Sequence, residues 1–108
     1  MSEVKACCAA DIAAAAADLV SGDRHQTHGD KQVNHEKIAS MWNVYLDIRR
    51  VPDAPLDGVD VALMMALLKV ARTQLGSPNL DDYVDICGYA ACAGEISNNL
   101  EASLVDEE

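Results

Sequence analysis

Residues 59–96 read VDVALMMALLKVARTQLGSPNLDDYVDICGYAACAGEI, and this stretch decides the fold. Its first part, to about Gln74, is apolar nearly all round, which predicts a helix that lies between neighbouring helices. Gly76 supplies a stop for that helix, and Ser77-Pro78 sets up the start of the next one. The stretch therefore predicts a helical hairpin at the centre of an all-α domain.

Both helices of this hairpin carry charges among residues that should be buried. Lys69 and Arg72 interrupt the first helix, and at 100° per residue they lie within about 60° of each other. On the second helix, steps of three and four residues place Asp82, Asp85 and Tyr89 on one face. Because the connection is short, we expect the cationic and acidic faces to meet.

Two interpretations of that meeting are compatible with the sequence. The first is an internal ion-pair network, since an unpaired buried charge is too costly to keep. In the second, Asp82 and Asp85 hold a divalent cation, while Lys69 and Arg72 receive the phosphates of a nucleotide. Both arrangements can hold at once.

Length and charge limit the possible functions. The chain has 108 residues, enough for one domain, and its 18 acidic against 8 basic residues give a formal charge of −10. This charge disfavours duplex nucleic acid as a partner, although a local pocket can still bind a small phosphorylated molecule. The N-terminus lacks the basic region of a signal peptide and contains Glu3, Asp11 and Asp18. We therefore expect a cytoplasmic protein without a membrane partner.

The rest of the chain divides into three parts, which together form one domain over residues 1–108. Residues 1–21 are alanine-rich and predict a helix, residues 22–33 form a polar loop, and residues 34–103 supply the core helices. The four helices are expected near 3–20, 34–49, 58–74 and 79–103 and form a four-helix bundle. Their predicted N-terminal caps are Asn34, Asp57 and, for the last helix, Ser77 or alternatively Asn79.

A dimer or higher homo-oligomer is expected from the distribution of small residues. The alanine-rich first helix and the run from Cys87 to Gly94 offer flat surfaces that one chain of this length does not cover. Gly88 and Gly94 each cost about 1 kcal/mol relative to alanine within a helix, so they suggest close approach of another helix or a ligand.

Three further residues are candidates for a site. His28 and Asp30 flank a glycine in the polar loop and could close a pocket or transfer a proton, although such residues also serve solubility alone. Trp42 recurs with Ile38 and Tyr45 at helical spacing, which favours core packing, and stacking on a base is the alternative.

With these residues laid out, the segment from His28 to Glu95 resembles a small family of phage and prophage proteins. The resemblance is carried by HGD at 28–30, NHEKIASMWNVYL at 34–46, DVALMMALLKVAR at 60–72 and DDYVDICGYAA at 81–91. If the chain is phage-encoded, the cytoplasm is that of the host. The Asp-x-x-Asp pattern at 82–85 is also similar to the all-α nucleotide pyrophosphatases of the MazG and dimeric dUTPase type.

This second resemblance implies a MazG-like arrangement of helices and hydrolysis of nucleoside triphosphates with Mg²⁺ held by carboxylates. The chain departs from the pattern where Met64, Met65, Leu68 and Lys69 replace the acidic cluster of the preceding helix. Whether the protein is an enzyme therefore stays open.

The hypothesis with a full set of roles is a Mg²⁺-dependent nucleoside triphosphate pyrophosphohydrolase. Its residues are Asp82 and Asp85 for the metal, Lys69, Arg72, Asn34, Trp42 and Tyr89 for the phosphates and the rest of the ligand, and His28 and Asp30 for catalysis. One alternative is a protein that sequesters a nucleotide, such as a signalling nucleotide of a host defence, without turnover. The other is a helical interaction module whose charges only fix register.

Overall fold

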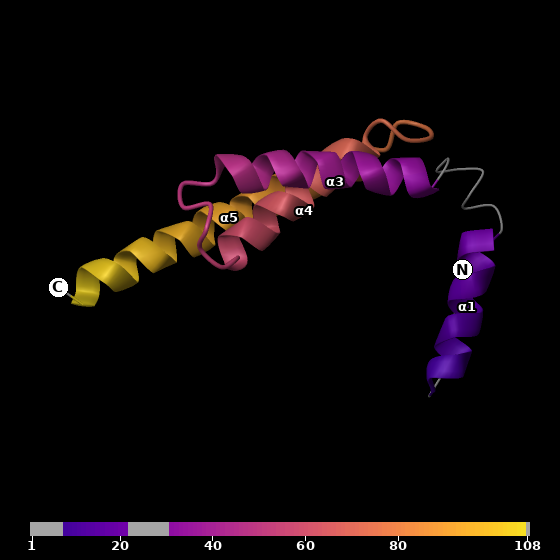
Figure 1. Ribbon diagram of the computed structural model, residues 1–108, viewed down its shortest axis with the longest axis horizontal. Helices are drawn as coiled ribbons and strands as arrows, with labels where there is room; N and C mark the ends of the chain where they lie inside the picture. The colour runs from indigo at the N-terminus through magenta and orange to yellow at the C-terminus, as the bar shows by residue number, and fades with distance from the viewer. Residues whose placement is uncertain (1–7, 22–30, 108) are drawn as a thin grey trace.

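The described part of the chain is entirely helical. The computed structural model describes residues 8–21 and 31–107, with helices α1 (Ala9–Ser21), α3 (Lys31–Ile48), α4 (Gly58–Arg72) and α5 (Leu80–Glu107). These residues contain no strand, which confirms the predicted all-α class. The molecule is elongated, with extents of 55 × 33 × 28 Å (Figure 1).

Helix α4 is the central element, and α3 and α5 pack on its two sides. Its Asp60 side chain contacts α3, whereas its Lys69 side chain contacts α5. These residues are nine positions apart, so their side chains point in roughly opposite directions from the helix axis. Since α3 and α5 make few or no direct contacts with each other, the three helices form an open layer.

The α4–α5 hairpin forms as predicted, and its local signals explain where the helices begin and end. Asp57 caps α4 in a capping box, because its carboxylate accepts from the N–H of Asp60 at 3.1 Å and its own N–H donates to Asp60 at 2.9 Å. Gly76 has φ 54°, the left-handed region that glycine adopts without strain. Asn79 accepts from the N–H of Asp81 at 3.0 Å just before α5 begins, as expected of a cap.

The structure corrects some of the predicted helix ends. Helix α3 is already helical at Lys31, so Asn34 lies inside its first turn and the predicted cap at Asn34 is wrong. Helix α4 ends at Arg72 rather than near 74, and α5 continues to Glu107 rather than 103. Helix α1 is described from Ala9, and the predicted residues before position 8 lie outside the described part.

The predicted four-helix bundle does not close within one chain. Helix α1 stands apart from the layer in Figure 1. All but one of its described residues are exposed, and Ile12, Leu19 and Val20 are between 49% and 56% exposed. An alanine-rich helix offers too little apolar area to hold itself against a core, which accounts for this position.

The interior of the layer is shallow. Among the residues whose side chains are described, only Ala62, Ala93, Asp60 and Asp82 are buried, and no large side chain is fully buried. Two of these four are alanines, which allow α4 and α5 to approach closely. No helix in the described ranges is long and apolar enough to cross a membrane.

Candidate functional site

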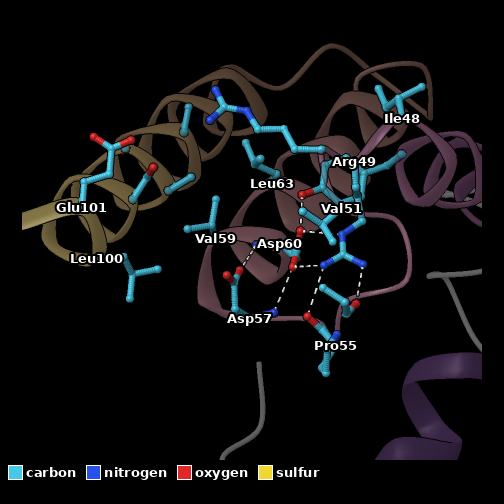
Figure 2. A pocket seen from close by; sticks show the side chains of 17 residues that line it. Ile48, Arg49, Val51, Pro55, Asp57, Val59, Asp60, Leu63, Leu100 and Glu101 are labelled. Atoms are coloured by element: carbon cyan, nitrogen blue, oxygen red, sulfur yellow. Dashed lines mark hydrogen bonds and ion pairs between the residues drawn. The ribbon is translucent and has the colours of Figure 1, made fainter. Parts of the chain in front are cut away.

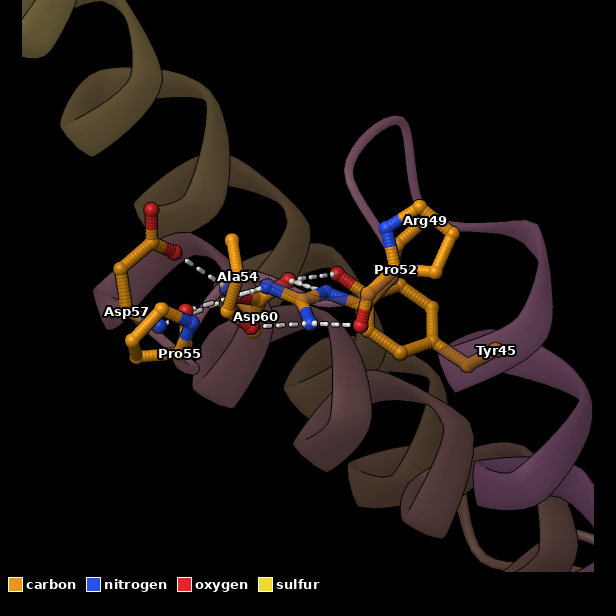
Figure 3. A network of polar contacts seen from close by, with 7 residues as sticks. All are labelled: Tyr45, Arg49, Pro52, Ala54, Pro55, Asp57 and Asp60. Carbon is orange, nitrogen blue, oxygen red and sulfur yellow. Dashed lines mark hydrogen bonds and ion pairs between the residues drawn. The ribbon is translucent and has the colours of Figure 1, made fainter.

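Two polar clusters lie on α4, and the sequence predicted only one of them. The unpredicted cluster joins the end of α3 to the start of α4 (Figure 3). Asp60 accepts from the Tyr45 hydroxyl at 2.6 Å and from Nε and Nη2 of Arg49 at 3.0 and 2.9 Å. The Arg49 and Asp60 side chains are each 9% exposed, so this is a buried ion pair.

Arg49 also holds the loop between α3 and α4. Its Nη1 donates to the carbonyls of Pro52 and Ala54 at 3.3 and 2.8 Å, and its Nη2 donates to that of Pro55 at 3.2 Å. With the two bonds to Asp60, all five N–H groups of the guanidinium are engaged. Arg49 is therefore a structural clamp and has no donor left for a ligand.

The pKa values of this cluster follow from its burial and hydrogen bonds. Burial alone would raise the pKa of Asp60, but hydrogen bonds from Tyr45, the Asp57 N–H and Arg49, with the charge of Arg49, outweigh it and lower the pKa to about 2. Burial and the hydrogen bond to Asp60 raise the pKa of Tyr45 to about 12. The folded protein thus keeps Asp60 ionised and Tyr45 neutral.

The sequence contains part of the signal for this cluster, but it does not show that the cluster's residues meet. Tyr45 and Arg49 are four residues apart and so share a helix face. Each charge also has a local explanation, since Arg49 follows the C-terminal end of α3 and Asp60 lies in the first turn of α4, where they suit the helix dipoles. Only the fold of the loop between them shows that they meet.

The predicted cluster lies on the α4–α5 hairpin. Lys69 Nζ lies 2.9 Å from Asp85 Oδ2, which confirms that opposite charges on the two helices meet. The side chains are 20% and 42% exposed, so solvent and a small solute reach this pair. The pair is therefore not sealed in the interior.

Arg72 and Asp82 lie together at the turn of the hairpin. They line a cavity of about 290 Å³ with Leu75, Gly76, Ser77, Pro78 and Asn79. Asp82 is 8% exposed and Arg72 is half-buried. Within the described ranges, no hydrogen bond or ion pair joins the Arg72 guanidinium to another residue. The cavity thus contains an arginine whose donors are available to a ligand.

The other predicted site residues are less closely connected with this cavity. Trp42 is half-buried and donates from Nε1 to the carbonyl oxygen of Met64 at 2.8 Å, so it fastens α3 to α4. Tyr89 is half-buried one turn after Asp85, and Asn34 lies near the start of α3. His28 and Asp30 lie outside the described residues.

A metal ion would find a limited donor set here. No group of three or more His, Cys, Asp or Glu side chains suited to a metal occurs within residues 8–21 and 31–103. Mg²⁺ is commonly held by one or two carboxylates together with water and substrate phosphates. Asp82 and Asp85 supply two carboxylates one turn apart, but Asp85 is paired with Lys69. Asp82 and Asp85 can hold Mg²⁺ together only if Asp85 leaves its ion pair with Lys69 and binds the ion instead.

A larger hollow lies at the opposite end of α4. It has a volume of about 700 Å³ and extends from the loop after α3 to the last third of α5, with Leu63 and Asp60 on its floor (Figure 2). The exposed residues Arg50, Asp57 and Glu101 line it, while most of its wall is apolar.

These features define an all-helical domain built on a charged hairpin, and comparisons place it among phage proteins. The chain belongs to the family described as Domain of unknown function (DUF6378), whose model matches residues 11–97. It is similar to the Gene 55 protein of Mycobacterium phage L5, with 43% identity over 79 residues that cover 73% of this chain and 47% of the relative.

It is also similar to the Gene 55 protein of Mycobacterium phage D29, with 32% identity over 78 residues, or 72% of this chain and 48% of that relative. The chain thus spans about half the length of the curated relatives it matches. The predicted membership in a phage protein family is confirmed. No solved structure matches, and the MazG-like arrangement stays a prediction.

Proposed function

We propose that this phage protein binds a nucleotide or a similar phosphorylated small molecule at the turn of the α4–α5 hairpin. The observation that carries the proposal is the half-buried Arg72, which lines a cavity and has no partner among the described residues. An arginine offers a planar set of donors that match two phosphate oxygens at once.

The contrast between the two arginine environments supports this assignment. All five donors of Arg49 bind Asp60 and three loop carbonyls, so this arginine stabilises the fold. Arg72 lies one turn from Lys69, whose charge is only partly screened by the exposed Asp85. The attraction for phosphate therefore rests on the hydrogen-bond donors of Arg72, with Lys69 close enough to contribute if Asp85 releases it.

Asp82 gives the cavity a second recognition element. Its carboxylate is almost buried beside the same cavity, and a carboxylate accepts hydrogen bonds and donates none. The sugar hydroxyls and exocyclic amines of nucleotides supply such donors. Phosphates at Arg72 and a hydroxyl or amine at Asp82 would fix the orientation of the ligand.

The donor set favours binding over turnover. Hydrolysis with Mg²⁺ would require Asp82 and Asp85 to hold the ion beside the phosphates, whereas Lys69 now pairs with Asp85. When bound, Mg²⁺ would neutralise phosphate charge and lower the pKa of a bound water. The hydrolytic hypothesis is kept as the second candidate because these two carboxylates share one face of α5.

The test is calorimetry of the purified chain with each ribonucleoside and deoxynucleoside triphosphate, first in chelator and then with Mg²⁺. We expect at least one nucleotide to bind in chelator. Arg72→Ala should weaken it about 10- to 100-fold, the effect of losing hydrogen bonds to a charged group. The matched control Arg50→Ala removes an exposed arginine outside this cavity and should bind like the wild type.

Pyrophosphate release in the Mg²⁺ samples distinguishes the two candidates. Release that Asp85→Asn abolishes, with the fold intact by circular dichroism, would favour the hydrolase. Absence of binding across the panel in both conditions would remove the proposal.

A further inference from the structure

The open layer leaves one broad apolar face of its three helices uncovered. The face, called here the uncharged face, comprises Val44 and Ile48 of α3, Leu63 and Leu67 of α4, and Ala90 and Gly94 of α5. Ile48 is 72% exposed and Val44 is 59% exposed. Neither value is expected for branched side chains that sit in a row beside other apolar groups.

Two hollows run into each other across this face. One of about 420 Å³ lies between α3 and α4, and the hollow of about 700 Å³ lies between the α3 end and α5. Tyr45, Ile48 and Leu63 line both of them, so the surface is continuous. Protein interiors are close-packed, and apolar hollows of this size call for side chains that fill them.

The surface area gives the size of what is missing. The chain exposes 8296 Å², whereas a folded monomer of 11.5 kDa exposes about 5,800 Å². The exposed area is that of the whole chain, so the open layer accounts for only part of the excess. A standard interface buries about 800 Å² on each partner, and obligate homodimers bury more. About one third of the excess, if the open layer supplies it, would match one partner's share of a standard interface.

We propose that a second copy of this chain covers the uncharged face, with Leu63 near the two-fold axis. The chain carries a formal charge of −10, so two copies can approach only through a surface that keeps their carboxylates apart. The six residues of the uncharged face carry no charge, and the exposed charged residues that line the larger hollow are Arg50, Asp57 and Glu101. A two-fold axis pairs such a patch with its own copy, so that apolar residues of one chain meet apolar residues of the other.

The position of Gly94 agrees with this arrangement. A Cβ atom added at Gly94 would meet nothing within 4 Å in the single chain. The close helix approach that the sequence predicted at this glycine is thus absent within one copy, and the second copy would provide it. The interface shares Ala90 and Gly94 with the predicted one, but α3 and α4 take the place of the first helix.

Sedimentation equilibrium at micromolar concentration tests the proposal, which does not depend on nucleotide binding. The wild type should be a dimer, and Ile48→Glu should give a helical monomer because the side chain is largely exposed in one copy. The control Val84→Glu changes a valine of similar exposure (59%) on α5. Val84 is two residues from the buried Asp82 and so points away from α4, and this variant should stay dimeric.

A second measurement covers the case in which Ile48→Glu does not fold. If the dimer is part of the folded state, the wild-type Tm should rise with protein concentration. Two results would overturn the proposal. One is a wild-type monomer whose Tm stays constant when the protein is diluted in 100-fold steps. The other is an Ile48→Glu variant that forms a dimer with unchanged affinity.

Discussion

The change Asp60→Asn tests how the buried cluster holds α3 and α4 together. In the wild type, the carboxylate accepts four hydrogen bonds, from the Tyr45 hydroxyl, two nitrogens of Arg49 and the Asp57 N–H. Asparagine keeps the shape but removes the charge that balances Arg49, whose side chain is only 9% exposed. Removing one partner of a buried ion pair typically costs about 3–5 kcal/mol.

The lowered pKa of Asp60, which reflects the same contacts, gives a lower figure. A shift from 3.8 to about 2 corresponds to roughly 2 kcal/mol of preferential stabilisation of the ionised form in the folded state. We therefore expect Asp60→Asn to lower the free energy of unfolding by about 3 kcal/mol, a large share of the stability of a small domain.

Urea denaturation followed by the fluorescence of Trp42, the only tryptophan, measures this loss at a fixed protein concentration. The control Asp47→Asn removes an exposed carboxylate of α3 and should change the free energy by less than about 0.5 kcal/mol. Adding Arg49→Met to Asp60→Asn should cost less than the sum of the two single changes. A loss below 1 kcal/mol for Asp60→Asn would refute the reasoning, since the buried pair would then not stabilise the fold.

Three further predictions follow from the same contacts. Because the folded-state pKa of Asp60 is lowered, its contribution to stability is fully present above pH 3.8 and is lost as the pH falls toward about 2. The urea midpoint of the wild type should therefore drop across this range, and this part of the drop should be absent in Asp60→Asn. Lys69→Met should change the free energy of unfolding by less than about 1 kcal/mol, because Asp85 is 42% exposed; a loss of 3 kcal/mol in the same assay would contradict a solvent-accessible pair. Gly76→Ala should destabilise by about 1–2 kcal/mol, since φ is 54° there, and an unchanged thermal midpoint would show that the turn has another conformation.

The sequence predicted the hairpin well because its signals are local. Apolar periodicity, the Asp57 cap and the Gly76 stop each act within one or two turns, and all three appear in the structure. The meeting of Lys69 with Asp85 also followed from helical spacing and a short turn. These predictions needed no knowledge of distant contacts.

The features that the sequence did not predict depend on the path of the chain between helices. The five donors of Arg49 reach Asp60 and three carbonyls only because the loop at 49–57 curves around the guanidinium. The prediction of a closed bundle was wrong because the composition of α1 predicts a helix but does not show which surface that helix covers. The open layer also follows from the opposite placement of α3 and α5 on α4, which periodicity in an apolar helix does not specify.

The division between a structural arginine and a ligand-binding arginine is the central claim, and an NMR titration tests it most directly. The chain labelled with ¹⁵N would be titrated with the nucleotide found by calorimetry, in chelator, while the Nε–Hε signals of both arginines are followed. The account predicts a large shift for Arg72 and for backbone amides of residues 76–85, with the Arg49 signal unchanged. Shifts centred on Arg49 and the loop after α3, with Arg72 unmoved, would contradict it.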